Sequence, residues 1–304
     1  MQSLSRPRVY AMLIVVLLLW AGNSIVGRAV RDDIPPFSLA LFRWTGALAI
    51  LLPFAWRRIL RDRKTIMARW PVILMLGALG VGAFNALLYS GLRHTTATNA
   101  LLIQAGIPAL VLAFDFAIFK NRPSPAQIAG VTIAATGVAT IVFKADPSAV
   151  FALRFGQGDL LVLAAVVAWG LYTALLRLRP PIDPLSFLAL TFMIGVAAML
   201  PGAAVEWRHA TIRATPVVIG AIAYVALLPS LVAYLLFNRA VAEIGAADAG
   251  QVISLQPLFG ALLAAPLLGE ALHPYHAAGM VLILLGLAVP LALRRATPPI
   301  RRPS

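Results

Sequence analysis

Apolar residues fill this chain in long uninterrupted runs, separated by short segments that hold proline, glycine or charge. A helix needs about 20 predominantly apolar residues to cross a bilayer. By this measure the chain has ten predicted spans, at Val9–Ala29, Pro35–Trp56, Trp70–Ser90, Thr95–Phe119, Pro125–Phe143, Gly158–Leu178, Pro184–Ala204, Pro216–Arg239, Ile244–Leu268 and Pro274–Leu293. The runs do not alternate with polar residues, which excludes the strands of a membrane β-barrel. The pattern predicts an all-α membrane protein.

Composition supports a bilayer as the surrounding solvent. The chain is 61% hydrophobic and 12% charged, whereas a soluble domain carries about 25% charged residues. A net charge of +14 would suggest nucleic-acid binding in a soluble protein. Here the basic residues lie in short loops between apolar runs, so we expect lipid contact and no nucleic-acid partner. The absence of cysteine excludes disulfides, thiolate metal sites and cysteine nucleophiles.

The distribution of lysine and arginine predicts the orientation. With the N-terminus inside, 17 of these residues fall on the inner side and 7 on the outer side, and Arg43 lies within a span. Because cytoplasmic loops carry the excess of basic residues, both termini are predicted to be cytoplasmic. We expect a multi-pass protein of a bacterial-type inner membrane, without a cleavable signal peptide.

The chain repeats itself at an offset of 149 residues without a gap. The offset pairs Trp20 with Trp169, Pro35 with Pro184, Gly46 with Gly195, Pro108 with Pro257, Pro125 with Pro274, Gly130 with Gly279 and Gly137 with Gly286. Each repeat holds five predicted spans, an odd number, so the second must cross the membrane in the opposite sense. Inverted repeats of this kind build carriers whose substrate site lies near the midplane, between the repeats.

The predicted domains follow from the repeat. A cytoplasmic tail (1–8) precedes the first five-helix repeat (9–143), and a linker (144–157) leads to the second repeat (158–293) and a basic cytoplasmic tail (294–304).

Several segments resemble the drug/metabolite transporter superfamily, in its ten-helix EamA-type branch. They are the paired LLLWAGNSIVGR (Leu17–Arg28) and AVVAWGLYTALLR (Ala165–Arg177), and the repeat ends Ile118–Val138 and Leu267–Leu287. The first repeat has Asn121 where Glu270 stands in the second, so the acidic residue of that loop occurs once. The resemblance covers nearly the whole chain and implies a transporter.

The resemblance also bears on the substrate. The YddG-type exporters of aromatic amino acids are one candidate subgroup. Small relatives that expel cationic drugs carry a glutamate in the first span, whereas this chain has Trp20, Asn23 and Ser24 there. This difference favours a neutral or zwitterionic substrate over a cation. Export of a drug or of a nucleotide-like metabolite by the same fold stays an alternative.

Two tryptophans lie near the middle of their spans, although tryptophan usually gathers at the membrane interface. They either pack between helices or against lipid, or they form aromatic walls of a central cavity. The same helical faces carry polar residues three and four positions on, and such a face should point inward. The candidate substrate-binding residues here are Trp20, Asn23, Ser24, Trp169, Tyr172 and Thr173.

Spaced pairs on the third and eighth spans form a second candidate. Asn85 and Tyr89 stand four positions apart, and their repeat mates Tyr234 and Asn238 are the same two types exchanged. Each pair makes one polar stripe on an apolar helix, which suits either interhelical hydrogen bonds or a cavity wall.

Polar residues and a proline interrupt the fourth and ninth spans. The prolines either kink the helix for packing or free backbone carbonyls to line a cavity. The candidates are Asn99 and Gln104 before Pro108, and Gln251 and Ser254 in the segment that also holds Asp248, Gln256 and Pro257.

Arg43 lies about 13 Å into its span at 1.5 Å per residue. A charge at this depth faces the bundle or water and commonly marks function. Arg43 is therefore either a structural hydrogen-bond hub or the site of a substrate carboxylate. Asp115 lies nearer the cytoplasmic end of its span, so we expect local pairing there and no contact with Arg43. Glu243 and Glu270, at span ends, are expected to be solvated.

The chain lacks a Walker P-loop, a nucleophile elbow, an HExxH motif and a metal-ligand cluster. We expect no cofactor and no catalytic residue, and we take a monomer as the working oligomeric state. The sequence favours a secondary transporter that moves a small neutral or zwitterionic metabolite outward by alternating access. Aromatic or apolar amino acids fit best, since aromatic walls favour large apolar side chains. A channel or a membrane enzyme is a weaker alternative, because no filter loop, charge ring or acid cluster is present.

Overall fold

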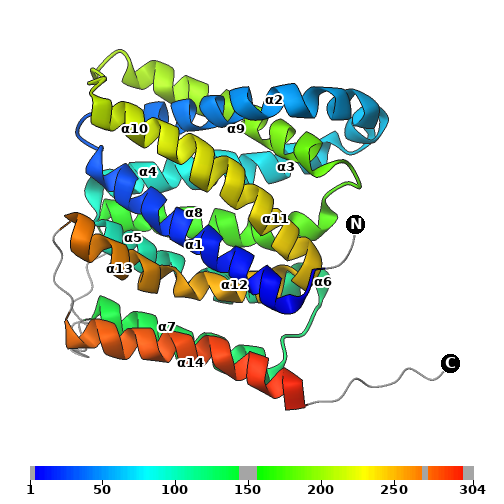
Figure 1. Cartoon of the computed structure of the whole chain (residues 1–304), viewed down its shortest axis with the longest axis vertical. Coiled ribbons are helices and arrows are strands. Elements are labelled where there is room, and N and C mark those ends of the chain that lie inside the picture. Colours follow the sequence, from blue (N-terminus) through cyan, green and yellow to red (C-terminus); the bar gives the residue numbers. More distant parts are fainter. Residues whose placement is uncertain (1–3, 144–155, 269–272, 297–304) are drawn as a thin grey trace.

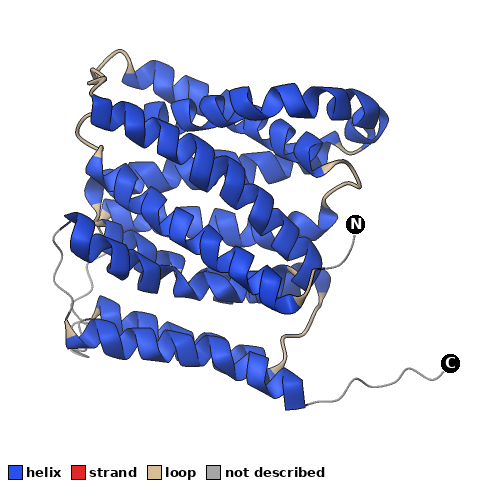
Figure 2. Ribbon diagram, in the orientation of Figure 1, coloured by secondary structure: helices blue, strands red, loops and turns tan. Residues whose placement is uncertain are grey.

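The computed structural model describes residues 4–143, 156–268 and 273–296, and every regular element in these stretches is a helix. Figure 2 shows helices joined by loops, with no strand in the described part of the chain. The predicted all-α class is therefore confirmed for those residues.

The helices follow the predicted apolar runs closely. In chain order they are α1 (Arg6–Ala29), α2 (Pro36–Ala68), α3 (Trp70–Gly77), η1 (Ala78–Ala83), α4 (Phe84–His94), α5 (Ala97–Gln104), α6 (Ile107–Phe119), α7 (Pro125–Val142), α8 (Gln157–Leu175), η3 (Leu176–Leu178), α9 (Pro184–Glu206), α10 (Pro216–Val225), η4 (Ala226–Val232), α11 (Ala233–Ile244), α12 (Ala246–Val252), η5 (Ile253–Leu255), α13 (Gln256–Leu268) and α14 (Pro274–Ala296). Several predicted ends were wrong. The clearest case is α2, which continues past Trp56 because Arg, Leu and Lys favour helix and tolerate water.

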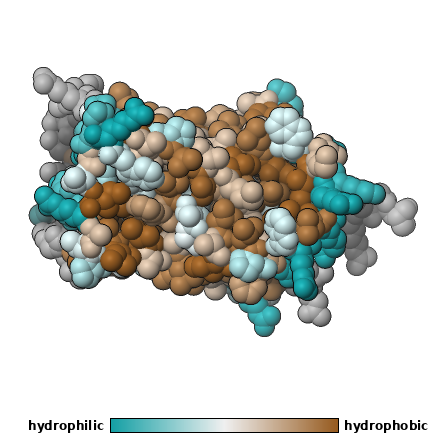
Figure 3. Space-filling model, turned by 90° about the horizontal axis from the view of Figure 1, so that it is seen from above, coloured by the Kyte–Doolittle hydropathy of each residue, from teal (hydrophilic) through white to brown (hydrophobic). Residues whose placement is uncertain are grey.

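Six helical stretches in the described residues are long and apolar enough to cross a bilayer: Arg6–Ala29, Pro36–Ala68, Trp70–His94, Gln157–Leu178, Pro184–Glu206 and Pro216–Ile244. Ile107–Phe119 and Pro274–Val289 are shorter apolar helices. Figure 3 shows a broad hydrophobic band on the visible face, with hydrophilic residues gathered toward its two ends. This distribution suits a surface surrounded by lipid, because large exposed apolar patches are rare on soluble monomers.

The helices lie side by side, with their long axes running across Figure 1. At one end of the stack α2 packs against α9, and at the other end α7 packs against α14. Between them α1 contacts α11 and α13, while α8 contacts α4 and α6. The central helices α1, α4, α8 and α11 therefore carry the side chains that meet in the middle of the molecule.

Glycines allow the closest of these contacts. A Cβ on Gly137 would lie 2.6 Å from the carbonyl oxygen of Gly279, and one on Gly286 would lie 2.5 Å from that of Gly130. Backbones approach this closely in membranes where small residues line the helix interface. The α7–α14 pair therefore depends on glycine at Gly137 and Gly286.

Helices α2 and α9 cap each other. The Glu206 carboxylate at the end of α9 accepts hydrogen bonds from the Phe37 and Ser38 backbone N–H groups at the start of α2, at 3.0 and 2.8 Å. Asp62 of α2 accepts from the N–H of Asp183 at the start of α9, at 2.8 Å. The Ser186 hydroxyl donates to the same carboxylate, at 2.8 Å. The negative charge of Asp62 complements the positive N-terminus of α9.

Two π-helical turns interrupt the third and eighth predicted spans. They are η1 and η4. Gly80 of η1 and Pro229 of η4 are separated by the same 149-residue offset as the repeated residues. Pro229 has no N–H to donate to the Val225 carbonyl one turn earlier, and the Ser230 hydroxyl donates to that carbonyl instead, at 2.7 Å. Such turns release carbonyls from the helical ladder and often occur at functional sites.

Candidate functional site

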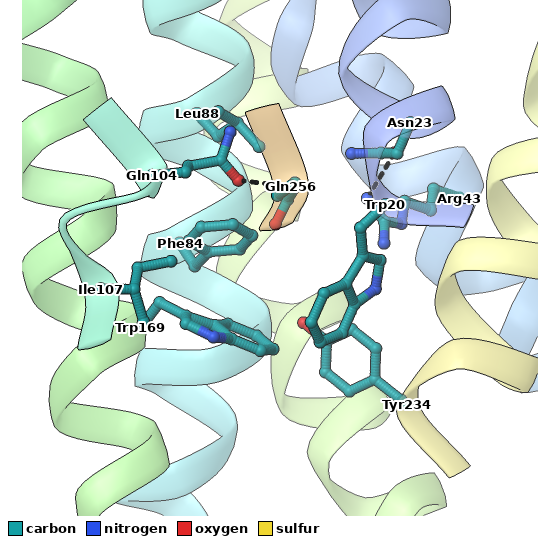
Figure 4. Close-up of a pocket in the computed structure, with 10 residues that line it drawn as sticks. All are labelled: Trp20, Asn23, Arg43, Phe84, Leu88, Gln104, Ile107, Trp169, Tyr234 and Gln256. Carbon is teal, nitrogen blue, oxygen red and sulfur yellow. Dashed lines mark hydrogen bonds between the residues drawn. The ribbon is translucent and has the colours of Figure 1, made fainter. Parts of the chain in front are cut away.

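A small cavity lies where the central helices meet (Figure 4). The side chains that line it come from Trp20, Asn23, Arg43, Phe84, Leu88, Gln104, Ile107, Trp169, Tyr234 and Gln256. Its volume is about 10 Å³, measured for the centre of a water molecule, and that is room for about one water. The cavity in this conformation is therefore nearly closed.

Arg43 is held by a cage of neutral acceptors and is 1% exposed. Its Nη1 donates to Oδ1 of Asn23, Oδ1 of Asn85 and the Tyr89 hydroxyl, at 2.8, 2.9 and 2.8 Å. Its Nε donates to the Ser230 hydroxyl. Its Nη2 lies 3.4 Å from the Pro229 carbonyl. Arg43 is thereby held in place by neutral groups while it lines the cavity.

The charge of Arg43 is not balanced by a carboxylate in the described part of the chain, since none of the ion pairs there includes it. The guanidinium lies 4.6 Å from the ring centroid of Trp44 and 5.9 Å from that of Tyr89, contacts that stabilise a cation. A buried cation without a counter-ion is nevertheless costly. The site therefore favours a negatively charged group beside Arg43.

Aromatic rings form the apolar part of the cavity wall. The ring centroids of Trp20 and Trp169 are 5.0 Å apart, with planes at 84°. Phe84 lies 4.8 Å from Trp169, and Phe237 lies 5.0 Å from Trp20. The Trp20 Nε1 donates to the Pro229 carbonyl released by η4, at 3.1 Å. The cluster thus offers a flat apolar surface. The Trp20 indole N–H is already hydrogen-bonded and is not available to a substrate.

Two tyrosine–asparagine hydrogen bonds flank the cavity. The Tyr89 hydroxyl donates to Oδ1 of Asn23 at 2.6 Å, and the Tyr172 hydroxyl donates to Oδ1 of Asn238 at 3.0 Å. Shifting the first pair by 149 residues gives the second pair with donor and acceptor exchanged. The first bond ties α1 to α4, and the second ties α8 to α11.

A pair of glutamines completes the polar lining. Gln256 Nε2 donates to Oε1 of Gln104 at 3.3 Å, and Gln104 Nε2 donates to the Ala100 carbonyl at 3.1 Å. Figure 4 shows the pair across the cavity from Asn23 and Arg43.

A second and wider pocket of about 420 Å³ lies beside the central cavity. It is lined by Arg179, Pro184, Leu235, Asn238, Arg239, Ala242 and Glu243. Asn238 of this pocket accepts a hydrogen bond from Tyr172, whose ring packs against Trp169 of the central cavity with ring centroids 5.0 Å apart. Tyr172 therefore lies between a lining residue of the wide pocket and a lining residue of the central cavity.

The structure brings many of the sequence-predicted site residues together. Trp20, Asn23, Arg43, Gln104, Trp169 and Tyr234 line the cavity, Asn85 and Tyr89 contact Arg43, and Tyr172 bonds to Asn238. Ser24 and Thr173 are buried away from the lining, with hydroxyls that find no hydrogen-bond partner among the described residues. The side chains of Asn99, Gln251 and Ser254 lie outside those described.

Four lining residues were not among the candidates chosen from the sequence: Phe84, Leu88, Ile107 and Gln256. The first three look like ordinary packing residues, so no sequence signal separates them. Gln256 had a signal, since it is a polar residue directly before a proline inside an apolar span. Ser230 and the Pro229 carbonyl were also missed, because helical periodicity does not reveal a π turn.

Two acidic residues near the site each pair with an arginine. Asp115 on α6 lies 3.1 Å from Nη1 of Arg177 on η3, so its partner comes from a distant segment and the expected pairing within its own span was wrong. Glu243 lies 2.6 Å from Nη2 of Arg239, one helical turn before it, and its side chain is 17% exposed. It also lines the wide pocket. Glu270 lies outside the described residues.

Apolar helices long enough to span a bilayer surround a cavity that holds polar, aromatic and cationic groups, an arrangement that suits a membrane transporter. Sequence comparison agrees, and the chain belongs to the EamA-like transporter family, whose profile matches residues 7–143 and again residues 156–291. The protein is therefore a multi-pass membrane transporter.

Individual relatives agree with this class. An uncharacterized transporter of Archaeoglobus fulgidus is 27% identical over 92% of this chain and 96% of its own. The uncharacterized transporter YyaM of Bacillus subtilis is 28% identical over 70% of each chain. A probable terminal-alkyne amino-acid exporter of Streptantibioticus cattleyicolor is 26% identical over 90% of each chain. A solved crystal structure shares the fold, with a TM-score of 0.74 at 19% identity, over 96% of this chain and 99% of that one.

Proposed function

We propose that this protein is a secondary transporter that moves a small zwitterionic metabolite, an amino acid with an aromatic or apolar side chain, outward across the inner membrane. The observation that carries the proposal is the unpaired, buried cation of Arg43 at the edge of an aromatic cavity. Arg43 would hold the carboxylate, and Trp20 and Trp169 would flank the side chain. The amino-acid exporter among the relatives supports this substrate class.

The architecture that we propose is ten spans in two inverted repeats, at residues 9–143 and 158–293. Three observations support it. The family profile matches twice along the chain. The paired Gly137–Gly279 and Gly286–Gly130 contacts follow the 149-residue offset. The two tyrosine–asparagine bonds do so as well. Related halves suit alternating access, in which one half rocks against the other around a fixed site.

Alternating access gives the two pockets different roles. The wide pocket contains Arg179 and Arg239, which the basic-residue rule assigns to the cytoplasm. We take it as the vestibule through which substrate enters from that side. Separation of Tyr172 from Asn238 would connect it to the central cavity, and separation of Tyr89 from Asn23 would open the opposite side.

Uptake into liposomes tests the function. Purified protein is reconstituted and assayed with labelled phenylalanine, leucine, phenethylamine and a nucleoside. We expect saturable uptake of the two amino acids, with accelerated exchange when unlabelled substrate is inside. Uptake of the nucleoside or amine alone would favour the alternative metabolite or drug exporter. Uptake that never saturates would indicate a channel, and chemical conversion of a solute would indicate an enzyme.

Cysteine labelling tests the orientation. Because the chain has no native cysteine, Thr65→Cys and Ala210→Cys can be labelled singly with a membrane-impermeant maleimide. With both termini cytoplasmic, we expect Ala210→Cys to react in intact cells and Thr65→Cys to react only after permeabilisation. The reverse pattern would show that the orientation is wrong, and the protein before substitution serves as the unlabelled control.

A further inference from the structure

The orientation of the Gln104–Gln256 pair follows from one backbone carbonyl. The Ala100 oxygen can only accept, so the group that Gln104 turns toward it at 3.1 Å must be the NH₂. Gln104 then turns its Oε1 toward Gln256, and the NH₂ of Gln256 donates a hydrogen bond to it. Both amides are thereby fixed, and Oε1 of Gln256 is the atom left over.

That remaining oxygen is buried and unused. Gln256 is 2% exposed, and its Oε1 has no hydrogen-bond partner in the described part of the chain. Figure 4 shows Oε1 turned away from Gln104, toward the space between Phe84 and Trp20. Buried polar groups in native proteins nearly always have a partner. An acceptor in this position therefore calls for a donor that enters the cavity.

The acceptor and the cation belong to one cavity but to different helices. Gln256 begins α13 and Gln104 ends α5, whereas Arg43 stands on α2 and its partner Asn23 on α1. The rings of Trp20, Trp169 and Phe84 complete the lining. The cavity thus combines a cation, Arg43, with a separate hydrogen-bond acceptor, Gln256, and an apolar wall.

We infer that Gln256 Oε1 accepts a hydrogen bond from a donor group of the substrate, the ammonium of an amino acid or the hydroxyl of a hydroxy acid, while Arg43 holds the same substrate's carboxylate. The inference rests on the proposed function and narrows it. It makes Gln256 a specificity-determining residue that separates these acids from carboxylates that lack the donor. A neutral amide oxygen suits this role, because it accepts a hydrogen bond without adding a second charge to the cavity.

Three solutes that differ at one position test the inference: phenylalanine, 3-phenyllactate and 3-phenylpropionate, assayed as initial uptake into liposomes. For the native protein we expect at least one of the first two to enter about tenfold faster than 3-phenylpropionate, the effect of one buried hydrogen bond. In Gln256→Met, which keeps the length and removes the acceptor, the ratio should fall to about one. Uptake of 3-phenylpropionate should stay within about twofold of native. The faster of the first two solutes identifies the donor.

Matched variants separate this role from a structural one. Gln157→Met changes the same residue type at an exposed position on α8 and should keep the native ratio. Gln256→Asn keeps an amide but places it one methylene closer to the backbone, so it should also lower the uptake ratio. It serves as the second test if thermal unfolding in detergent shows that Gln256→Met is poorly folded. An unchanged ratio in either folded Gln256 variant overturns the inference and leaves the transport function intact. No uptake of any of the three solutes by the native protein overturns the proposed function and the inference together.

Discussion

Replacing Arg43 by lysine should lower amino-acid uptake by about 10–100-fold, a free-energy change of about 1.4–2.8 kcal/mol. Lysine keeps the charge but loses the planar fork that matches a carboxylate. In the native protein Nη1 and Nε are committed to Asn23, Asn85, Tyr89 and Ser230. A lysine ammonium, with three donors, cannot serve these acceptors and a substrate as well. Arg43→Met, which removes the charge, should reduce uptake further.

The measurement compares phenylalanine with phenylalanine amide in liposomes, alongside thermal unfolding in detergent. The native protein should prefer the acid, and Arg43→Met should lose this preference. Arg208→Lys is the matched control, because Arg208 is exposed and distant in the chain from the cavity residues. If folded Arg43 variants discriminate acid from amide as well as the native protein does, Arg43 is a structural hub and does not bind substrate.

The two tryptophans should show an aromatic requirement. Trp20 and Trp169 are 8% and 2% exposed, so alanine at either should cost about 3–5 kcal/mol of folding stability. Phenylalanine and leucine preserve most of the volume, and only phenylalanine preserves a π-face. We therefore expect Trp169→Phe to retain uptake within about threefold and Trp169→Leu to lose about tenfold, since aromatic contacts contribute about 0.5–1.5 kcal/mol beyond burial.

Initial uptake rates, measured together with melting temperatures, test whether these two positions require an aromatic ring. Trp70→Leu is the control, because Trp70 is exposed on α3. The same pair of variants at Trp20 should show a smaller benefit from phenylalanine, because both lose the Nε1 bond to Pro229. Folded leucine variants with native rates would remove both rings from the substrate path.

Much of the site was readable along the chain, because polar side chains inside apolar spans stand out. Asn85 and Tyr89, four positions apart, had to share one helical face, and both contact Arg43. The depth of Arg43 marked it as a residue facing the bundle interior. Its partners could not be assigned, because Asn23, Asn85 and Ser230 come from three other segments whose rotation depends on packing.

By itself, the sequence determined the helical class, the family and the six long apolar spans found in the described residues, because hydrophobic runs and sequence motifs can be read directly along the chain. The tertiary structure alone decided three further features. The π turns at η1 and η4 follow from local backbone geometry that a 3.6-residue period does not encode. The neutral cage of Arg43 depends on which helix faces meet. The unpaired oxygen of Gln256 depends on a chain of hydrogen bonds that begins at the Ala100 carbonyl on another helix.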